Sequence, residues 1–150
     1  MESIVEGDLV QYLEESEESL FVTGKAGAGK SVQMKRYASR NKDRVLRVAP
    51  TGIAALNCGG ATIHRVFRLP IHPIVDKPHE IAKGAMKAGP ELKAAHTLLV
   101  DEIGMVRTDV WDCIDKILRL VKRRDEPFGG VRSIGFGDLY QLPPIVKGAE

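Results

Sequence analysis

The chain has 150 residues, of which 43% are hydrophobic and 28% charged, so it is long enough for one domain with a buried core. Its net charge of +2 excludes the strongly basic composition that marks many nucleic-acid-binding proteins. No apolar run approaches the ~18 residues of a membrane span, and the first residues lack the pattern of a secretory signal.

Two isolated cysteines, Cys58 and Cys113, lack metal-ligand spacing. In a chain without a signal peptide they indicate free thiols in a reducing compartment. We therefore expect an intracellular protein without a membrane partner.

The N-terminal half alternates helical and strand patterns. In 7–16 the apolar positions Leu9, Val10 and Leu13 suit a short amphipathic helix. The pattern then predicts a buried strand over 19–24, a helix over 30–40, a strand over 45–50, a helix from Thr51 to Gly59-Gly60, and a short helix capped by Thr62.

The C-terminal half continues this alternation. The pattern predicts an irregular loop over 69–78, helix formers over 79–96 broken at Gly89-Pro90, a third strand over 96–102, an amphipathic helix over 108–123 and a fourth strand over 131–138. Strands that alternate with helices predict one α/β domain over 1–150 with a mostly parallel sheet.

Residues 24–31 read GKAGAGKS, which fits the P-loop pattern between a predicted strand and a predicted helix. Such a loop points backbone N–H groups at an anion, and the following helix adds its positive end. Lys30 would contact the β/γ-phosphates, and the Ser31 hydroxyl would ligate Mg²⁺. The other predicted nucleotide contacts are Gly24, Ala26, Gly27, Ala28, Gly29 and Val32. The alternative is a chance Gly-rich turn.

Two carboxylates, Asp101 and Glu102, end the third predicted strand. The carboxyl edge of a parallel sheet is where such folds bind ligands. Asp101 would hold Mg²⁺, and Glu102 would orient and deprotonate the attacking water, which indicates a hydrolase. The alternative is a pair of acids at a helix start.

Gln141 lies in the segment GDLYQLPP (137–144) that ends the fourth predicted strand. Its amide is both a donor and an acceptor, so it could report whether a γ-phosphate is present. A surface turn is equally compatible with the spacing.

Five segments together, GKAGAGKS, APTGIAA (49–55), GATIH (60–64), DEIGM (101–105) and GDLYQLPP, resemble a superfamily-one DNA helicase. The resemblance is strongest to the petite integration frequency (PIF) helicases, relatives of RecD. It implies the first RecA-like motor domain, a three-layer α/β/α P-loop NTPase, of an ATP-driven helicase that moves 5′ to 3′ on single-stranded DNA. It also implies roles in DNA repair, recombination and telomere maintenance.

The resemblance assigns DNA contacts as well. Pro50, Thr51 and Gly52 match the segment that grips the strand's backbone. Thr62 and His64 match the next DNA-binding segment, where the imidazole would stack on the strand or bond to it. Taken without the family, His64 is more often a packed histidine.

Three positions depart from the family pattern. Gln11 lies inside a predicted helix, so we do not expect it to read adenine. Gly104 stands where the family usually has serine, and Val32 replaces a second hydroxyl after Lys30.

The resemblance also implies a second RecA-like domain with arginine fingers, which no arginine here matches. We expect a fragment that ends just after the Gln141 motif and that alone binds nucleotide weakly and does not unwind DNA. In a eukaryote it would act in the nucleus or mitochondrion, in a bacterium in the cytoplasm or nucleoid. Alternative functions are a P-loop ATPase switch or accessory protein, or a nucleotide-binding module without catalysis.

Overall fold

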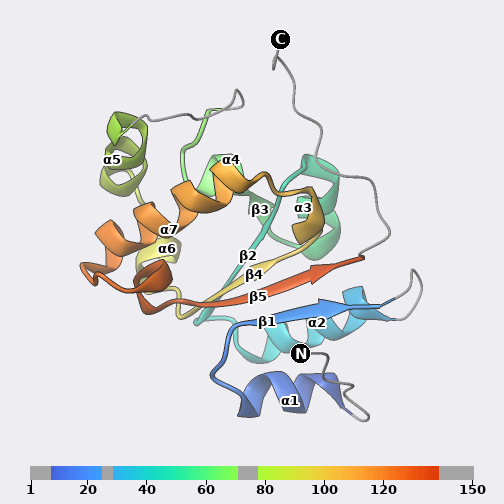
Figure 1. Cartoon of the computed structure of the whole chain (residues 1–150). Coiled ribbons are helices and arrows are strands. Elements are labelled where there is room, and N and C mark those ends of the chain that lie inside the picture. The colour runs from blue at the N-terminus through green and yellow to red at the C-terminus, as the bar shows by residue number, and fades with distance from the viewer. Residues whose placement is uncertain (1–7, 25–28, 71–77, 139–150) are drawn as a thin grey trace.

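The computed structural model describes residues 8–24, 29–70 and 78–138, which form a parallel sheet between two layers of helices (Figure 1). The strands are β1 (Leu20–Thr23), β2 (Val45–Ala49), β3 (Ala61–Thr62), β4 (Thr97–Val100) and β5 (Arg132–Gly137). Their order is β1-β5-β4-β2-β3, and all the pairings are parallel. The predicted three-layer α/β/α fold is confirmed.

The predicted helices are present within a few residues of the expected bounds. They are α1 (Leu9–Glu15), α2 (Lys30–Arg40), α3 (Gly52–Cys58), α4 (Ile63–Val66), α5 (Pro78–Met86), α6 (Pro90–Ala94) and α7 (Thr108–Lys122). Two 3₁₀ turns, η1 (Ile103–Met105) and η2 (Pro127–Gly130), follow β4 and precede β5. Within the described ranges, no helix is long and apolar enough to cross a membrane. The predicted loop over 69–78 lies mostly outside the described residues.

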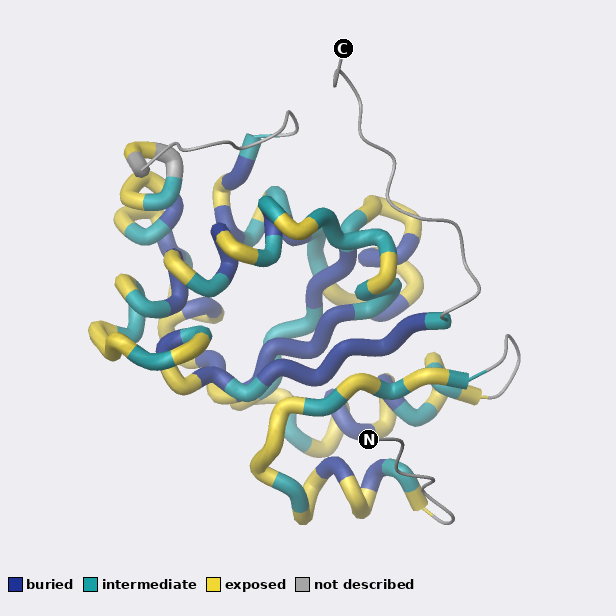
Figure 2. The backbone as a smooth tube through the Cα atoms, viewed as in Figure 1, coloured by how far each residue is buried: buried dark blue, intermediate teal, exposed yellow. Residues whose placement is uncertain are grey.

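Two hydrophobic cores lie on opposite faces of the sheet. On one face, Ile114, Ile117 and Leu118 of α7 are fully buried against the sheet together with residues of α4 and α6. On the other face, α1, α2 and α3 pack around residues such as Leu99 and Ile134. The whole of β4 is buried between the two layers, as expected of a strand inside a parallel sheet (Figure 2).

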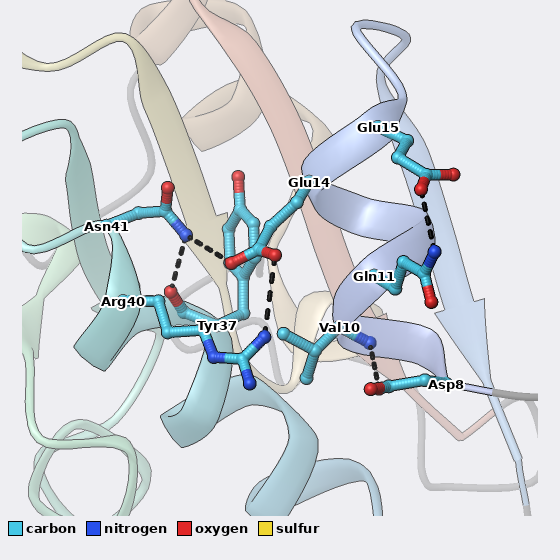
Figure 3. Close-up of polar contacts among 8 residues, drawn as sticks. All are labelled: Asp8, Val10, Gln11, Glu14, Glu15, Tyr37, Arg40 and Asn41. Atoms are coloured by element: carbon cyan, nitrogen blue, oxygen red, sulfur yellow. Dashed lines mark hydrogen bonds and ion pairs between the residues drawn. The ribbon is translucent and has the colours of Figure 1, made fainter.

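Helix α1 is attached to α2 by polar contacts as well as by its apolar side. Glu14 accepts a hydrogen bond from Asn41 Nδ2 at 3.4 Å and pairs with Arg40 at 3.5 Å (Figure 3). Val10 and Leu13 of α1 are buried beneath this contact. The amphipathic pattern of 7–16 thus reflects real burial.

The sheet differs from the prediction at both edges. The pattern of 19–24 predicts a buried strand, but among the described residues β1 is an edge strand and its Phe21 is 48% exposed. Leu20 and Val22 pack on the α1–α3 layer, whereas Phe21 points to the opposite face, beyond the hydrophobic cluster under α7. At the other edge, β3 was not predicted because two residues are too short to show a period.

The two cysteines are free and buried, Cys58 on α3 and Cys113 on α7. Burial raises the pKa of both thiols, so both are protonated at neutral pH. They act as small packing residues on the two faces of the sheet.

Candidate nucleotide and nucleic-acid site

The strand register brings the predicted motifs to one edge of the sheet. Thr23 at the end of β1 pairs with Gly137 of β5, and Ala49 at the end of β2 pairs with Thr62 of β3. Val100, the last residue of β4, lies between β5 and β2. Neighbouring strands are about 4.8 Å apart, so β1 and β4, with β5 between them, are separated by about 10 Å.

The P-loop is described at its two ends, Gly24 and Gly29. Gly29 has a φ of 84°, a left-handed conformation that favours glycine, and it is the N-cap of α2. Gly29 has no side chain with which to cap this helix start, so its first N–H groups are left without a partner from their N-cap residue. Ser31 and Val32 are exposed in the first turn. Ala26, Gly27 and Ala28 lie outside the described residues.

Lys30 links the P-loop to the neighbouring strand. Its ammonium group donates hydrogen bonds to the carbonyl oxygen of Gly24 and, at 3.2 Å, to that of Gly137. The side chain therefore lies across the ends of β1 and β5. This is the position from which a cation can contact a phosphate bound by the loop.

Asp101 and Glu102 follow β4 directly. The carboxylate of Asp101 accepts a hydrogen bond from the Glu102 backbone N–H at 2.9 Å. Burial raises the pKa of Asp101, although this hydrogen bond and the charge of Lys30 act in the opposite direction. The residue is half-buried and adjacent to a cation, which suits a carboxylate that holds a metal ion.

Glu102 adopts a left-handed conformation, with φ 53° and ψ 43°, which is uncommon for a residue other than glycine. It occupies the N-cap position of η1 without capping it through its side chain. The alternative interpretation, in which the two acids lie at a helix start, agrees with the backbone position of Glu102. The Glu102 side chain, however, does not cap the turn.

Turn η1 packs closely on β5. A side chain at Gly135 would place its Cβ 2.3 Å from Cδ1 of Ile103, and a Cβ at Gly137 would lie 3.2 Å from Cγ2 of the same residue. The glycines of β5 thus make room for Ile103. This contact was not predicted from the sequence, although alternating glycines in a strand signal the close approach of another segment.

Gly104, which stands where the family usually has serine, has space around it for a side chain. Of the described residues, an added Cβ would meet only Asp138, through its carbonyl oxygen at 4.0 Å. The serine typical of the family would fit there and would lie near the start of the Gln141 motif. Gln141 itself lies outside the described residues.

Two predicted DNA-contact residues are helix caps. Thr51 Oγ1 accepts a hydrogen bond from Ala54 N at 3.2 Å at the start of α3, and Thr62 Oγ1 accepts one from Arg65 N at 3.2 Å at the start of α4. Each hydroxyl keeps its proton available for a phosphate oxygen. Thr51 and Gly52 are exposed, and Pro50 and Thr62 are half-buried.

His64 on α4 is half-buried. Burial, and next the charge of Arg107, lower its pKa, while Asp109 acts in the opposite direction. The imidazole is therefore neutral at pH 7. Arg107 is fixed by a bidentate ion pair with Asp109, with N–O distances of 2.9 and 2.6 Å. This ion pair was not predicted from the sequence, where its only signal is the two-residue spacing at a helix start.

Gln11 lies on α1, and its amide donates a hydrogen bond to Glu15 on the same helix at 2.8 Å (Figure 3). Both side chains are exposed. This position agrees with the expectation that Gln11 does not read a base.

A parallel sheet with a P-loop after β1 and a carboxylate after the central strand β4 defines a RecA-like P-loop NTPase domain. The model of the PIF1-like helicase family matches residues 2–150. The chain belongs to the PIF1-like helicase family.

Curated relatives and solved structures agree with this family. The chain is 34% identical over 143 residues to the ATP-dependent DNA helicase PIF1 of Emericella nidulans and 34% identical over 136 residues to that of Homo sapiens. Each match covers 89% of this chain, and 19% and 21% of the relatives. The chain therefore spans about a fifth of their length.

Among solved structures, Bacteroides Pif1 bound to ssDNA is 39% identical, with a TM-score of 0.75 over 93% of this chain and 32% of that one. A Bacteroides Pif1 complex with ADP-AlF3 and ssDNA is 38% identical, with a TM-score of 0.77 over 99% of this chain and 35% of that one. The RecA-like fold is thus shown by both the topology and the neighbours.

Proposed function

We propose that this chain is the ATP-binding and ATP-hydrolysing motor domain of a DNA helicase that moves 5′ to 3′ on single-stranded DNA. The observation that carries the proposal is the position of Lys30, whose ammonium group bridges the ends of β1 and β5 next to Asp101. The relatives named ATP-dependent DNA helicase, and the Pif1 complex with ADP-AlF3 and ssDNA, support it.

The nucleotide would bind at the carboxyl edge of β1, β5 and β4. The P-loop, from Gly24 through Val32, would wrap the phosphates, and Lys30 would exchange its carbonyl partners for phosphate oxygens. Mg²⁺ would be held by the Ser31 hydroxyl and, directly or through water, by Asp101. A hydroxyl and a carboxylate are hard oxygen ligands that suit this ion, which usually keeps several waters and phosphate oxygens. Bound Mg²⁺ would offset the cost of keeping Asp101 ionised while half-buried.

Hydrolysis would depend on Glu102 and Gln141. Glu102 would orient the attacking water and accept its proton, and Gln141 would contact the γ-phosphate. The packing of η1 on β5 supports a coupling of the two, because Glu102 precedes η1 and the Gln141 motif follows β5.

The DNA strand would cross the ends of β2 and β3. Pro50, Thr51 and Gly52 at the start of α3, and Thr62 and His64 at α4, would contact it. A neutral imidazole can stack on a base or accept a hydrogen bond, and stacking tolerates any sequence. The proposed nucleotide and DNA contacts then share one edge of one sheet.

We propose one domain over 1–150, which needs a second RecA-like domain for full activity. Such a domain would close the nucleotide cleft and supply arginine fingers, which contribute roughly 10³–10⁵ in rate in phosphoryl-transfer enzymes. The 150-residue chain by itself should bind nucleotide weakly, hydrolyse it slowly and unwind no duplex.

The test measures binding of a fluorescent oligo-dT by anisotropy, with Thr51→Ala, His64→Ala and their combination. Thr51→Ser is the matched control, because it keeps the hydroxyl and the cap of α3. We expect the double variant to bind at least ~10-fold more weakly and the control to stay within about 2-fold of wild type. Equal affinity of the double variant would remove the DNA part of the proposal. Nucleotide binding without any oligo-dT binding would favour an ATPase switch instead.

A further inference from the structure

A pocket of about 470 Å³ lies beside the first half of β2, away from the proposed nucleotide site. Residues of β2, the turn between α3 and β3, α4 and α6 line it. Pockets that bind small ligands have volumes of this order. None of the residues proposed above to contact nucleotide or DNA lines it.

The pocket exists because β3 is short. Within the described residues β3 pairs with β2 only at Val48 and Ala49, so no strand lies beside 45–47 on that side. Gly60 begins the return of the chain, and a Cβ there would lie 2.3 Å from the backbone oxygen of Arg47. The close approach of this turn closes one end of the pocket and leaves the edge of β2 as its floor.

Three arginines line the pocket: Arg47 of β2, Arg65 of α4 and Arg68 just after that helix. The guanidinium of Arg47 donates to the carbonyl oxygen of Cys58 at 3.0 Å and lies against Gly59, where a Cβ would be 2.8 Å from Nη1. This contact fixes the group at the wall and leaves its other N–H donors for a ligand.

Arg65 and Arg68 are exposed and form no ion pair with any residue in the described ranges. Among the described residues that line the pocket, Glu91 of α6 is the only carboxylate, so the arginines outnumber the acids in this part of the chain. Arg68 also has a φ of 56°, at the position after α4 where glycine is the usual residue. A residue other than glycine has a higher conformational energy at such a φ, and here it places a charge at the pocket rim.

We propose that this pocket binds a phosphate group, and that its source is a backbone phosphate of the nucleic-acid strand. Guanidinium groups match phosphate oxygens in geometry and charge, and two or three of them around one pocket form a phosphate site. Arg65 lines the pocket and directly follows His64 on α4, so the proposed strand contact and the pocket share this helix. The choice of nucleic acid as the source rests on the proposed function; the phosphate chemistry does not.

The experiment compares two double variants that remove the same charge. Arg65→Gln with Arg68→Gln alters the pocket, whereas Lys35→Gln with Arg36→Gln alters two exposed residues of α2 on the other face of the sheet. Oligo-dT affinity is measured by anisotropy over a range of salt concentrations. Tripolyphosphate binding is measured by calorimetry in chains that also carry Lys30→Ala, so that the contribution of the P-loop is reduced equally in every chain compared.

We expect the pocket variant to bind oligo-dT at least about 5-fold more weakly, with a salt slope reduced by roughly 0.7–1.4, and the α2 variant to match wild type. Glu91→Gln should strengthen binding about 2-fold or more, because it removes the opposing charge. If only tripolyphosphate binding is lost, the pocket is a phosphate site whose source is a free phosphate compound. If the pocket variant keeps both ligands as well as the α2 variant does, the proposal is wrong.

Failure of the proposed function gives a different pattern. A wild-type chain that binds neither nucleotide nor oligo-dT would contradict the proposed function. The pocket would still be tested by tripolyphosphate. Binding to the Lys30→Ala chain that is lost with Arg65→Gln and Arg68→Gln would show that the pocket binds phosphate. Circular dichroism should be used to check that each variant is folded. We expect the pocket variants to fold, because Arg65 and Arg68 are exposed.

Discussion

The ammonium group of Lys30 donates a hydrogen bond to the carbonyl oxygen of Gly137 at 3.2 Å, across 107 positions of the chain. The two residues meet because β1 and β5 are paired in parallel with Thr23 beside Gly137. The lysine is thereby held near the place where phosphates would bind, which lowers the conformational entropy that binding must remove.

Replacement of Lys30 tests this position. At 100 times its Kd, a ligand stabilises a folded protein by about 2.7 kcal/mol, so Mg²⁺ with a slowly hydrolysed ATP analogue should raise the melting temperature of wild type. We expect Lys30→Ala to lose most of this rise, as measured by differential scanning fluorimetry. Lys35→Ala, on an exposed position of the same helix, is the control. An equal rise in Lys30→Ala would show that the ligand binds elsewhere.

Asp101→Asn should stabilise the free protein at neutral pH. Burial raises the pKa of Asp101 in the fold, so the folded state binds more protons than the unfolded state just above the usual aspartate range. Wild-type stability therefore falls as the pH rises through that window and stays lower at pH 7. Asparagine carries no charge and can still accept the Glu102 N–H.

The measurement for Asp101→Asn is urea unfolding at several pH values. The gain in the free energy of unfolding should be present at pH 7 and vanish below the usual aspartate pKa, where the wild-type carboxyl is protonated. The same variant should lose the Mg²⁺-dependent part of nucleotide stabilisation. A variant less stable than wild type at pH 7 would argue against a carboxylate destabilised by burial.

Gly135→Ala should destabilise the fold by about 1–3 kcal/mol, because its new methyl group would overlap Ile103. Ile103→Val removes the Cδ1 atom that lies 2.3 Å from the added Cβ. The double variant should therefore be at least about 1 kcal/mol more stable than the sum of the single effects predicts. Urea unfolding of wild type, the two single variants and the double variant gives this coupling energy. Strictly additive effects would argue against the contact between Ile103 and Gly135.

His64 should make the protein less stable in mild acid. Its pKa is lowered in the fold, chiefly by burial, so the unfolded state binds more protons as the pH falls below about 6.5. Stability is lost on acidification until the folded-state pKa is passed. His64→Asn should reduce this loss between pH 7.5 and 5, measured by thermal unfolding. His96→Asn serves as the comparison, and an unchanged pH profile in His64→Asn would contradict the cause assigned here.

Local signals were sufficient for most of the elements. The helix caps Thr51 and Thr62, the break at Gly89-Pro90 and the apolar face of 108–123 depend on neighbouring residues, and the structure confirms them. The ends of the P-loop and the carboxylates after β4 also lie at the carboxyl edge, as predicted. The position of a strand within the sheet was harder to predict, because an apolar run such as LFV has the same pattern in an edge strand as in a central one.

The P-loop, the acidic strand end and the family resemblance came from the sequence by itself, because each depends on residue types at fixed spacing along the chain. Only the tertiary structure decided that Lys30 reaches Gly137, that Ile103 fills the space over Gly135, and that three arginines share one pocket. These relationships join residues brought together by strand order and register. The exposure of Phe21 has the same cause, since within the described residues β1 pairs with β5 alone.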